Sequence, residues 1–152
     1  MRLRIIWLGK TRDARLRGLI EDYVGRLSHF ARVEITEVRE AGRTDKVGID
    51  RDIKRISDAL PAGSMTVILD PDGVEWTSLQ LAGQVQGWEN RGIKEVVFVI
   101  GGPNGLAPAL LSQADKCWSL SRLTLTHEMA RVLLLEQLYR AYTIIQGLPY
   151  QK

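Results

Sequence analysis

One stretch of sequence constrains the fold of this chain more than any other. Residues 95–105 read EVVFVIGGPNG, and the uninterrupted apolar run from Val96 to Ile100 leads directly into two glycines. Such a run is typical of a parallel strand that is buried on both faces. The glycines allow a sharp turn or a close approach between backbone and ligand. Because open α/β sheets bind small molecules at the carboxyl ends of central strands, the stretch predicts a ligand site. An ordinary strand-to-helix turn would show the same pattern.

Strand and helix patterns alternate along the whole chain. The expected strands are 2–8, 32–38, 65–69, 95–100 and 116–120, and the expected helices are 13–30, 49–60, 78–90, 106–114 and 126–146. No repeat, low-complexity segment or linker interrupts this order. The pattern predicts one α/β domain over residues 1–152 with a mostly parallel sheet.

Three local signals refine this prediction. Residues 32–38 alternate strictly between polar and apolar side chains, which favours a strand at or near the edge of the sheet. The sequence Asp70-Pro71-Asp72-Gly73 is typical of a turn and is expected to end the strand at 65–69. Asp13 precedes the first helix, and Thr77 or Ser78 precedes the third, where each is expected to cap it.

Composition excludes several classes of function. The chain has one cysteine and two histidines that lie far apart, so an internal disulfide and a zinc cluster are not expected. We therefore expect metal-free chemistry in a reducing compartment. No apolar stretch approaches the length of a membrane span, and the first residues do not form a signal peptide. These features favour a cytoplasmic protein without a membrane partner.

Positive charge is concentrated in the first third of the chain. Residues 1–55 contain 14 Lys and Arg against 9 Asp and Glu, whereas residues 56–152 contain 7 against 9. Arginine predominates in the basic part, and its guanidinium group can pair with phosphate through two hydrogen bonds. The asymmetry fits a surface that faces a polyanion, and it equally fits an ordinary solvated face of a soluble protein.

The last expected helix is unusually apolar. Residues 127–146 read HEMARVLLLEQLYRAYTIIQ, and apolar side chains occupy more than the single stripe that a surface helix needs. A homodimer that packs through this helix would cover the extra surface. A central helix buried within one chain would account for the same pattern.

Several motifs together resemble one known family. IGGPNGL at 100–106, WSLSRLTLTHEMARVLLLEQLYRAY at 118–142 and the terminal PYQK are similar to the RlmH family of SPOUT methyltransferases, and the resemblance covers the chain in length and order of elements. It implies a SPOUT-type α/β fold with helices on both sheet faces and a carboxyl-terminal trefoil knot. It also implies a homodimer with its sites at the subunit interface. The implied reaction transfers methyl from S-adenosyl-L-methionine to N3 of pseudouridine 1915, in helix 69 of the large-subunit ribosomal RNA.

The resemblance also implies which residues bind the cofactor. They fall in three loops: the end of the strand at 65–69, the glycine loop, and the segment before the last helix. The cofactor-binding residues implied in this way are Leu69, Gly101, Gly102, Gly105, Ser121, Arg122, Leu123, Thr124, Leu125 and Thr126. Turn geometry for the glycines and ordinary core packing for the leucines remain alternatives.

Four further residues are expected to act on the RNA. Tyr150 and His127 are the expected catalytic groups, through a hydrogen bond, base stacking or assistance with one proton. A helix-start role for His127 remains equally open. Arg131, on the presumed polar face of the last helix, and Lys152 are expected to bind substrate. Gln151 stands where many relatives have histidine, which puts a catalytic role for a tail histidine in doubt.

Three other functions remain as alternatives. A related SPOUT enzyme would act on transfer RNA, for example at a ribose 2′-hydroxyl. A non-catalytic RNA-binding or ribosome-assembly protein would keep the fold, and Gln151 is the feature that points to it. A flavodoxin-like binding domain is disfavoured, because Gly9-Lys10-Thr11 after the first strand has too few glycines for a phosphate-binding turn.

Overall fold

The computed structural model describes residues 1–102 and 105–150. Every predicted strand and helix is present in the predicted order. The strands are β1 (Arg2–Leu8), β2 (Arg32–Val38), β3 (Met65–Glu75), β4 (Glu95–Ile100) and β5 (Lys116–Ser119). The helices are α1 (Ala14–Leu27), α2 (Lys46–Ala59), α3 (Ser78–Asn90), α4 (Pro108–Leu111) and α5 (His127–Ile145).

The strands form one sheet in the order β2-β1-β4-β3-β5, and all pairings are parallel. The predicted parallel sheet is therefore confirmed, and so is the edge position of β2. Ile5 of β1 lies between Ile35 of β2 and Phe98 of β4 in register. Parallel pairing brings the carboxyl ends of all five strands to one edge, where the expected site lies.

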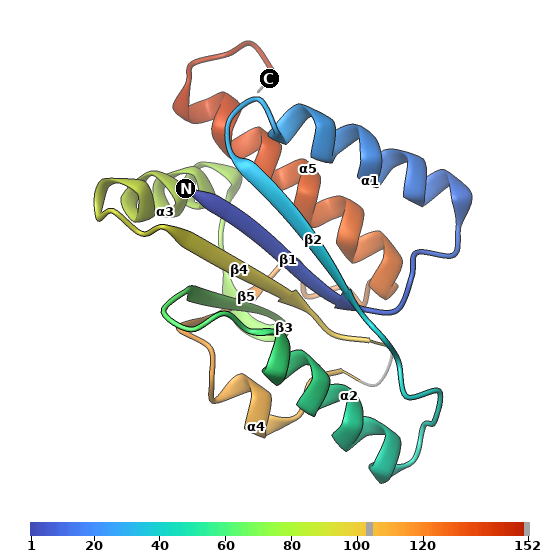
Figure 1. Ribbon diagram of the computed structural model, residues 1–152. Coiled ribbons are helices and arrows are strands. Elements are labelled where there is room, and N and C mark those ends of the chain that lie inside the picture. The colour runs from blue at the N-terminus through green and yellow to red at the C-terminus, as the bar shows by residue number, and fades with distance from the viewer. Residues whose placement is uncertain (103–104, 151–152) are drawn as a thin grey trace.

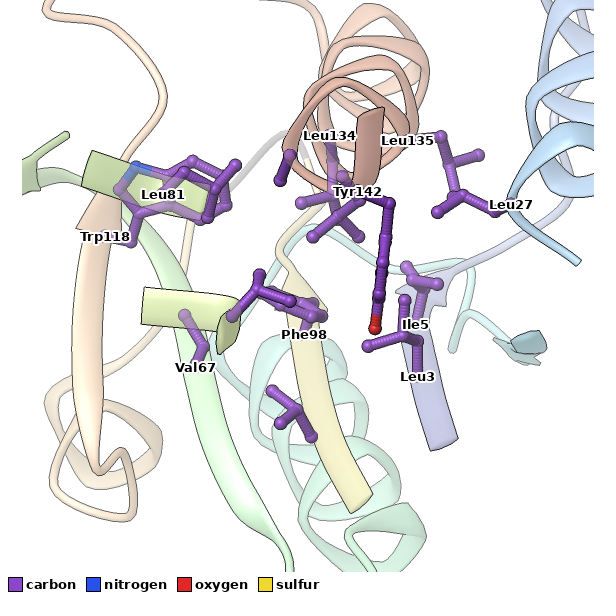
Figure 2. Close-up of a cluster of buried hydrophobic side chains, with 14 of the residues drawn as sticks. Leu3, Ile5, Leu27, Val67, Leu81, Phe98, Trp118, Leu134, Leu135 and Tyr142 are labelled. Carbon is purple, nitrogen blue, oxygen red and sulfur yellow. The ribbon is translucent and has the colours of Figure 1, made fainter. Parts of the chain in front are cut away.

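Helices cover both faces of the sheet (Figure 1). Leu3, Ile5 and Phe98 pack with α1, α3 and α5, and Figure 2 shows these side chains facing Leu134 and Leu135 of α5. Alternate strand residues form a second buried cluster with α2 and α4. The apolar run in β4 is continuous because its side chains are buried on both faces.

The predicted turn at residues 70–73 is wrong, because β3 continues to Glu75. Both Leu69 and Val74 pair with Trp118, so the intervening residues form a bulge rather than the end of the strand. A Cβ on Gly73 would lie 2.6 Å from the carbonyl oxygen of Cys117. The glycine therefore lets β3 rejoin β5 at close range after the bulge.

Helix α5 lies against the sheet between α1 and α3 and contacts both helices (Figure 1). The buried residues of α5 are Arg131, Val132, Leu134, Leu135, Leu138, Ala141, Tyr142 and Thr143. Its broad apolar surface is thus explained within one chain, and the alternative of a central helix accounts for the sequence pattern. The homodimer and the trefoil knot both stay predictions.

Asp13 caps α1 as predicted, and its environment gives an acid-sensitivity prediction. Its Oδ1 accepts hydrogen bonds from the amides of Arg15 (2.9 Å) and Leu16 (3.3 Å). The hydrogen bond from the Arg15 guanidinium and the amide of Leu16 lower the pKa of Asp13 from 3.8 to about 2. Because the carboxyl pKa is lower in the folded protein, the ionised Asp13 stabilises the fold at pH values above 3.8. This stabilisation is lost as pH falls from 3.8 towards 2.

We therefore expect Asp13→Asn, which keeps a capping oxygen without the charge, to flatten the acid-unfolding curve in this pH window. Circular dichroism at 222 nm during acid titration measures the effect. Superimposable curves for the two proteins would contradict the charge contribution.

Candidate active site

An apolar cavity of about 520 Å³ opens at the bulge within β3 and the carboxyl end of β4, beside the start of α5. Its size falls within the range of small-molecule sites, roughly 300–1,000 Å³. It is lined by Leu69, Asp70, Pro71, Ile100, Gly101, Gly102, Gly105, Leu106, Leu120, Ser121, Leu123, Leu125, Thr126, His127 and Ala130. The three loops named from the sequence therefore meet at one place.

Close packing behind the glycine loop explains why this wall lacks side chains. A Cβ on Gly101 would lie 2.8 Å from Leu106 Cγ, and a Cβ on Gly102 would lie 3.3 Å from Leu8 Cδ1. Gly105 has φ of +72°, a backbone conformation that favours glycine. The loop thus presents main-chain atoms to the cavity, so a ligand can approach the backbone directly.

The third wall is the segment between β5 and α5. Ser121 orders it, because its carbonyl accepts from Ser119 Oγ and its own Oγ accepts from the amide of Leu123, each at 3.0 Å. Leu123 is 75 % exposed at the cavity mouth. Thr126 then caps α5 by accepting from the Met129 amide at 3.2 Å.

Two residues of this segment have side chains outside the cavity lining. Arg122 pairs with Glu75 at 2.9 Å and donates to the carbonyl of Pro71, so it ties the segment to the end of β3. Thr124 is exposed and does not line the cavity.

His127 is the first residue of α5 and lines the cavity. The amino end of a helix carries a partial positive charge, which favours a negatively charged group there. The next residue, Glu128, accepts hydrogen bonds from the amides of Arg12 (3.0 Å) and Asp13 (3.1 Å). The first turn of α5 is therefore attached to the segment that follows β1.

Comparison with known proteins agrees with this architecture. Residues 1–151 match the family described as "Predicted SPOUT methyltransferase". The chain belongs to the SPOUT methyltransferase family.

Curated relatives of this SPOUT methyltransferase match it over nearly its whole length. Two of them, both named "Ribosomal RNA large subunit methyltransferase H", come from Geobacter sp. strain M21 and Desulfotalea psychrophila. The first is 44 % identical over 151 residues, 99 % of this chain and 98 % of the relative. The second is 40 % identical over 153 residues and covers 100 % of both chains. The resemblance inferred from the sequence motifs is therefore confirmed.

Two solved structures share the fold of this SPOUT methyltransferase. A methylase family protein from Haemophilus influenzae aligns with a TM-score of 0.57 and 14 % identity over 99 % of this chain and 70 % of that one. A Legionella pneumophila protein, solved with the cofactor SAM bound, aligns with a TM-score of 0.54 and 13 % identity over 93 % and 66 % of the two chains. At these identities the two comparisons show a shared fold alone.

The predicted position of Arg131 on an exposed polar face of α5 in this SPOUT methyltransferase is wrong. The side chain is 1 % exposed. Its Nη2 donates to the carbonyl of Leu8 (2.6 Å) and its Nη1 to Thr11 Oγ1 (2.9 Å). The guanidinium carbon lies 4.8 Å from the centre of the Trp7 ring. Burial lowers the pKa of Arg131, and Glu128 acts against that shift. The side chain braces the end of β1 against α5 and is not available to a substrate.

Tyr150 packs back against the middle of α5 and does not line the cavity. Its hydroxyl is 3.0 Å from Glu136 Oε1 and 3.3 Å from the Tyr23 hydroxyl, and its ring packs on Tyr139 at 4.8 Å. Glu136 lies about 13 Å along the helix axis from His127, so the Tyr150 hydroxyl does not reach His127 within one chain. Burial, followed by the contacts with Tyr23 and Glu136, raises the pKa of Tyr150. The phenol is therefore protonated at neutral pH and acts as a hydrogen-bond donor. Lys152 and Gln151 fall outside the described residues.

Six further residues line the cavity that sequence reasoning did not assign to it, namely Asp70, Pro71, Ile100, Leu106, Leu120 and Ala130. Asp70, Ile100, Leu106 and Leu120 each adjoin in sequence a residue that was predicted to bind the cofactor. Ala130 lies one helical turn after Thr126. Helical spacing and adjacency would have identified them.

Within the described ranges, His, Cys, Asp and Glu form no group of three that could hold a metal ion. No helix in these ranges has the length and apolar character needed to cross a membrane.

Proposed function

We propose that this chain transfers a methyl group from S-adenosyl-L-methionine to the large-subunit ribosomal RNA, at N3 of pseudouridine 1915 in helix 69. The observation that carries the proposal is the glycine-walled apolar cavity between the bulge of β3 and the carboxyl end of β4, in a chain of this family. The names of the curated relatives, which describe large-subunit ribosomal RNA methyltransferases, support the choice of substrate.

The cavity lining fits S-adenosyl-L-methionine. Leu69, Leu123 and Leu125 offer apolar walls for an adenine ring, and the bare backbone at Gly101 and Gly102 accepts a ligand at close range. When bound, the cofactor supplies an activated methyl group on its sulfonium sulfur. The protein then has to hold the acceptor nitrogen of the RNA in line with the bond between sulfur and methyl, and to assist removal of the N3 proton.

Two groups are proposed to act on the acceptor base. The N3–H of pseudouridine is a weakly acidic imide, so hydrogen bonds to the neighbouring carbonyl oxygens help it to lose the proton. His127 lies at the cavity, and the Tyr150 hydroxyl is a protonated donor. Because Tyr150 packs against the middle of α5 and does not line the cavity of its own chain, it is proposed to act at the cavity of a second copy.

A homodimer is therefore part of the proposal. Leu19 of α1 and Met129 of α5 are 44 % and 40 % exposed, and Leu123 is exposed at the cavity mouth. These side chains offer apolar surface to a second copy.

We also propose a single domain over residues 1–152, a cytoplasmic location and a knotted carboxyl terminus. The knot is supported by the resemblance to the SPOUT methyltransferase family.

A methylation assay tests the proposed function. Purified protein is incubated with methyl-labelled S-adenosyl-L-methionine and with bacterial 70S ribosomes, protein-free ribosomal RNA or transfer RNA. We expect label in helix 69 of the large-subunit RNA, mapped by nuclease digestion and mass spectrometry. Label in transfer RNA, or at a ribose hydroxyl, would overturn the proposed substrate, and no label in any RNA would overturn the activity.

Tyr150→Phe is expected to lower kcat about a hundredfold while cofactor affinity stays nearly unchanged, because it removes one donor near the reacting base. Single-turnover methylation and calorimetric cofactor binding measure the two quantities. Tyr23→Phe is the matched control, since it removes the hydroxyl partner of Tyr150 and keeps the Tyr150 hydroxyl. Equal losses of kcat in the two variants would show that Tyr150 has only a structural role. An unchanged kcat in Tyr150→Phe would show that its hydroxyl takes no part in the chemistry.

A further inference from the structure

The segment between β1 and α1, residues 9–13, lies at the carboxyl edge of the sheet, and we call it the β1–α1 loop. The amide of Gly9 donates to the carbonyl of Val38 at 2.7 Å. Arg131 holds Thr11 from α5, and Glu128 accepts from the last two amides of the loop. The sheet and α5 therefore both fix the backbone of this loop.

Helix α1 provides a third brace. Arg17 donates from Nε to the carbonyl of Thr11 (3.2 Å) and from Nη2 to the carbonyl of Arg12 (3.3 Å). Asp13 caps the helix and pairs with Arg15 at 2.8 Å. The loop is thus a rigid platform rather than a passive connection.

Only two long side chains of the loop remain untethered, and both are cationic. Lys10 and Arg12 are exposed, and neither side chain makes a hydrogen bond or ion pair to any residue in the ranges 1–102 and 105–150. Several other basic residues of the first third are paired, for example Arg4, which pairs with Glu34 at 3.0 Å and with Glu95 at 3.4 Å. Arg39 and Lys46 are also exposed without a side-chain partner in the described ranges. What distinguishes Lys10 and Arg12 is their position on the braced β1–α1 loop at the carboxyl edge of the sheet.

Nearby carboxylates do not pair with these cations. Glu37 accepts from Trp7 Nε1 at 3.2 Å, and Glu128 accepts the two loop amides. Glu40 lies against Gly9, where an added Cβ would meet its carboxylate. The charge of Lys10 and Arg12 is therefore directed to solvent.

Arg12 also lies close to the proposed reaction centre. It lines a second cavity of about 310 Å³, and this cavity shares Gly102, Gly105 and Leu106 with the first cavity. These three residues border both cavities, so Arg12 and the site of the proposed methyl donor lie beside the same wall. A phosphate held by Arg12 would place its nucleotide next to that wall.

We infer that Lys10 and Arg12 form a phosphate-binding pair that positions the RNA so that the target nucleotide lies at the glycine wall. The inference rests on the proposed function and deepens it. An arginine fork on a rigid loop loses little conformational freedom when it binds phosphate through two hydrogen bonds. The β1–α1 loop has too few glycines for a phosphate-binding turn, so the side chains of Lys10 and Arg12 provide the phosphate contacts instead. Both residues are positioning residues and contact neither the cofactor cavity nor the reacting atoms.

The test uses the double variant Lys10→Gln/Arg12→Gln in the full chain. The binding of 70S ribosomes is measured by sedimentation at several salt concentrations, and methylation is measured in parallel. We expect binding to weaken about tenfold to a hundredfold, and the slope of log K against log salt to fall by about two, one for each lost phosphate contact. The KM for ribosomes should rise while kcat at saturation and the calorimetric affinity for S-adenosyl-L-methionine stay unchanged.

The matched control is Arg91→Gln/Lys94→Gln, which makes the same charge change between α3 and β4, at the amino edge of the sheet. It should leave ribosome binding and its salt slope nearly unchanged. Arg12→Lys should retain the salt slope and lose affinity, because it keeps the charge without the fork. Equal binding by the Lys10→Gln/Arg12→Gln variant and wild type, or an equal loss in the control, would overturn the inference.

Failure of the proposed function is separately visible. A wild-type protein that binds ribosomes but transfers no methyl group would refute the activity and leave the binding comparison intact. Conversely, methylation by wild type together with an unaltered salt slope in the double variant would refute only the role of Lys10 and Arg12, and the proposed function would stand.

Discussion

Gly102→Val is expected to reduce the affinity for S-adenosyl-L-methionine about a hundredfold, because overpacking of this size costs up to about 3 kcal/mol. An added Cβ would already lie 3.3 Å from Leu8 Cδ1, so the two further methyl groups of valine must occupy the cavity or displace the glycine wall. Arg131 anchors Leu8 from α5, which limits how far the wall can move. Isothermal titration calorimetry with purified protein measures the loss.

Gly83→Val provides the matched control. Gly83 is exposed on α3, and a Cβ there would meet nothing within 4 Å. This variant should bind the cofactor as wild type does, with equal or slightly higher stability, because valine has a higher helix propensity than glycine. If Gly102→Val folds with a normal melting temperature and binds normally, the cofactor does not occupy this cavity.

Phe98→Ala is expected to lower the free energy of unfolding by about 3–5 kcal/mol, a large part of the roughly 5–15 kcal/mol typical of a domain. Phe98 is fully buried on β4, and its ring lies 6.2 Å from Trp88 and 6.3 Å from Trp118. These neighbours belong to α3 and β5, so the cavity left by alanine would weaken the packing between the sheet and α3. Urea denaturation followed by tryptophan fluorescence measures the change.

Phe98→Leu retains most of the apolar volume and should cost about 1 kcal/mol. Denaturation midpoints of the three proteins should therefore fall in the order wild type, leucine, alanine, with similar slopes. If the alanine variant loses less than the leucine variant, this part of the core is not packed as the structure places it.

Much of the fold could be predicted because its signals are local. Residues 95–100 are apolar without interruption, and the structure buries this strand from both sides. Strict alternation at 32–38 corresponds to the edge strand, and Asp13 and Thr77 cap helices where the sequence suggested. In each case the residue type and its immediate neighbours determine the outcome.

The errors arose where a distant residue decided the outcome. Arg131 has a polar side chain in a helix, and only the position of the carbonyl of Leu8, 123 residues away, explains its burial. The bulge after Leu69 depends on contact with β5, so the turn motif alone was misleading. Tyr150 was assigned to the chemistry from its likeness to the family's closing motif, and because its hydroxyl packs on Glu136 in its own subunit, that role stays a prediction.

The same distinction applies to the basic residues. Counting charges in the first third predicted a polyanion surface but did not separate paired from free side chains. Arg4 and Arg12 look alike in sequence, but one lies in an ion-pair network and the other is free. That difference depends on strand register, which places Glu34 and Glu95 beside β1.

The position of α5 has a consequence for biosynthesis. Helix α5 follows all five strands along the chain, and it fills the middle of its layer, between α1 and α3. Until it emerges from the translating ribosome, the face of the sheet with Leu3, Ile5 and Phe98 lacks its central helix. The nascent chain therefore exposes apolar surface until α5 is made, and protection by a chaperone matters most in that interval.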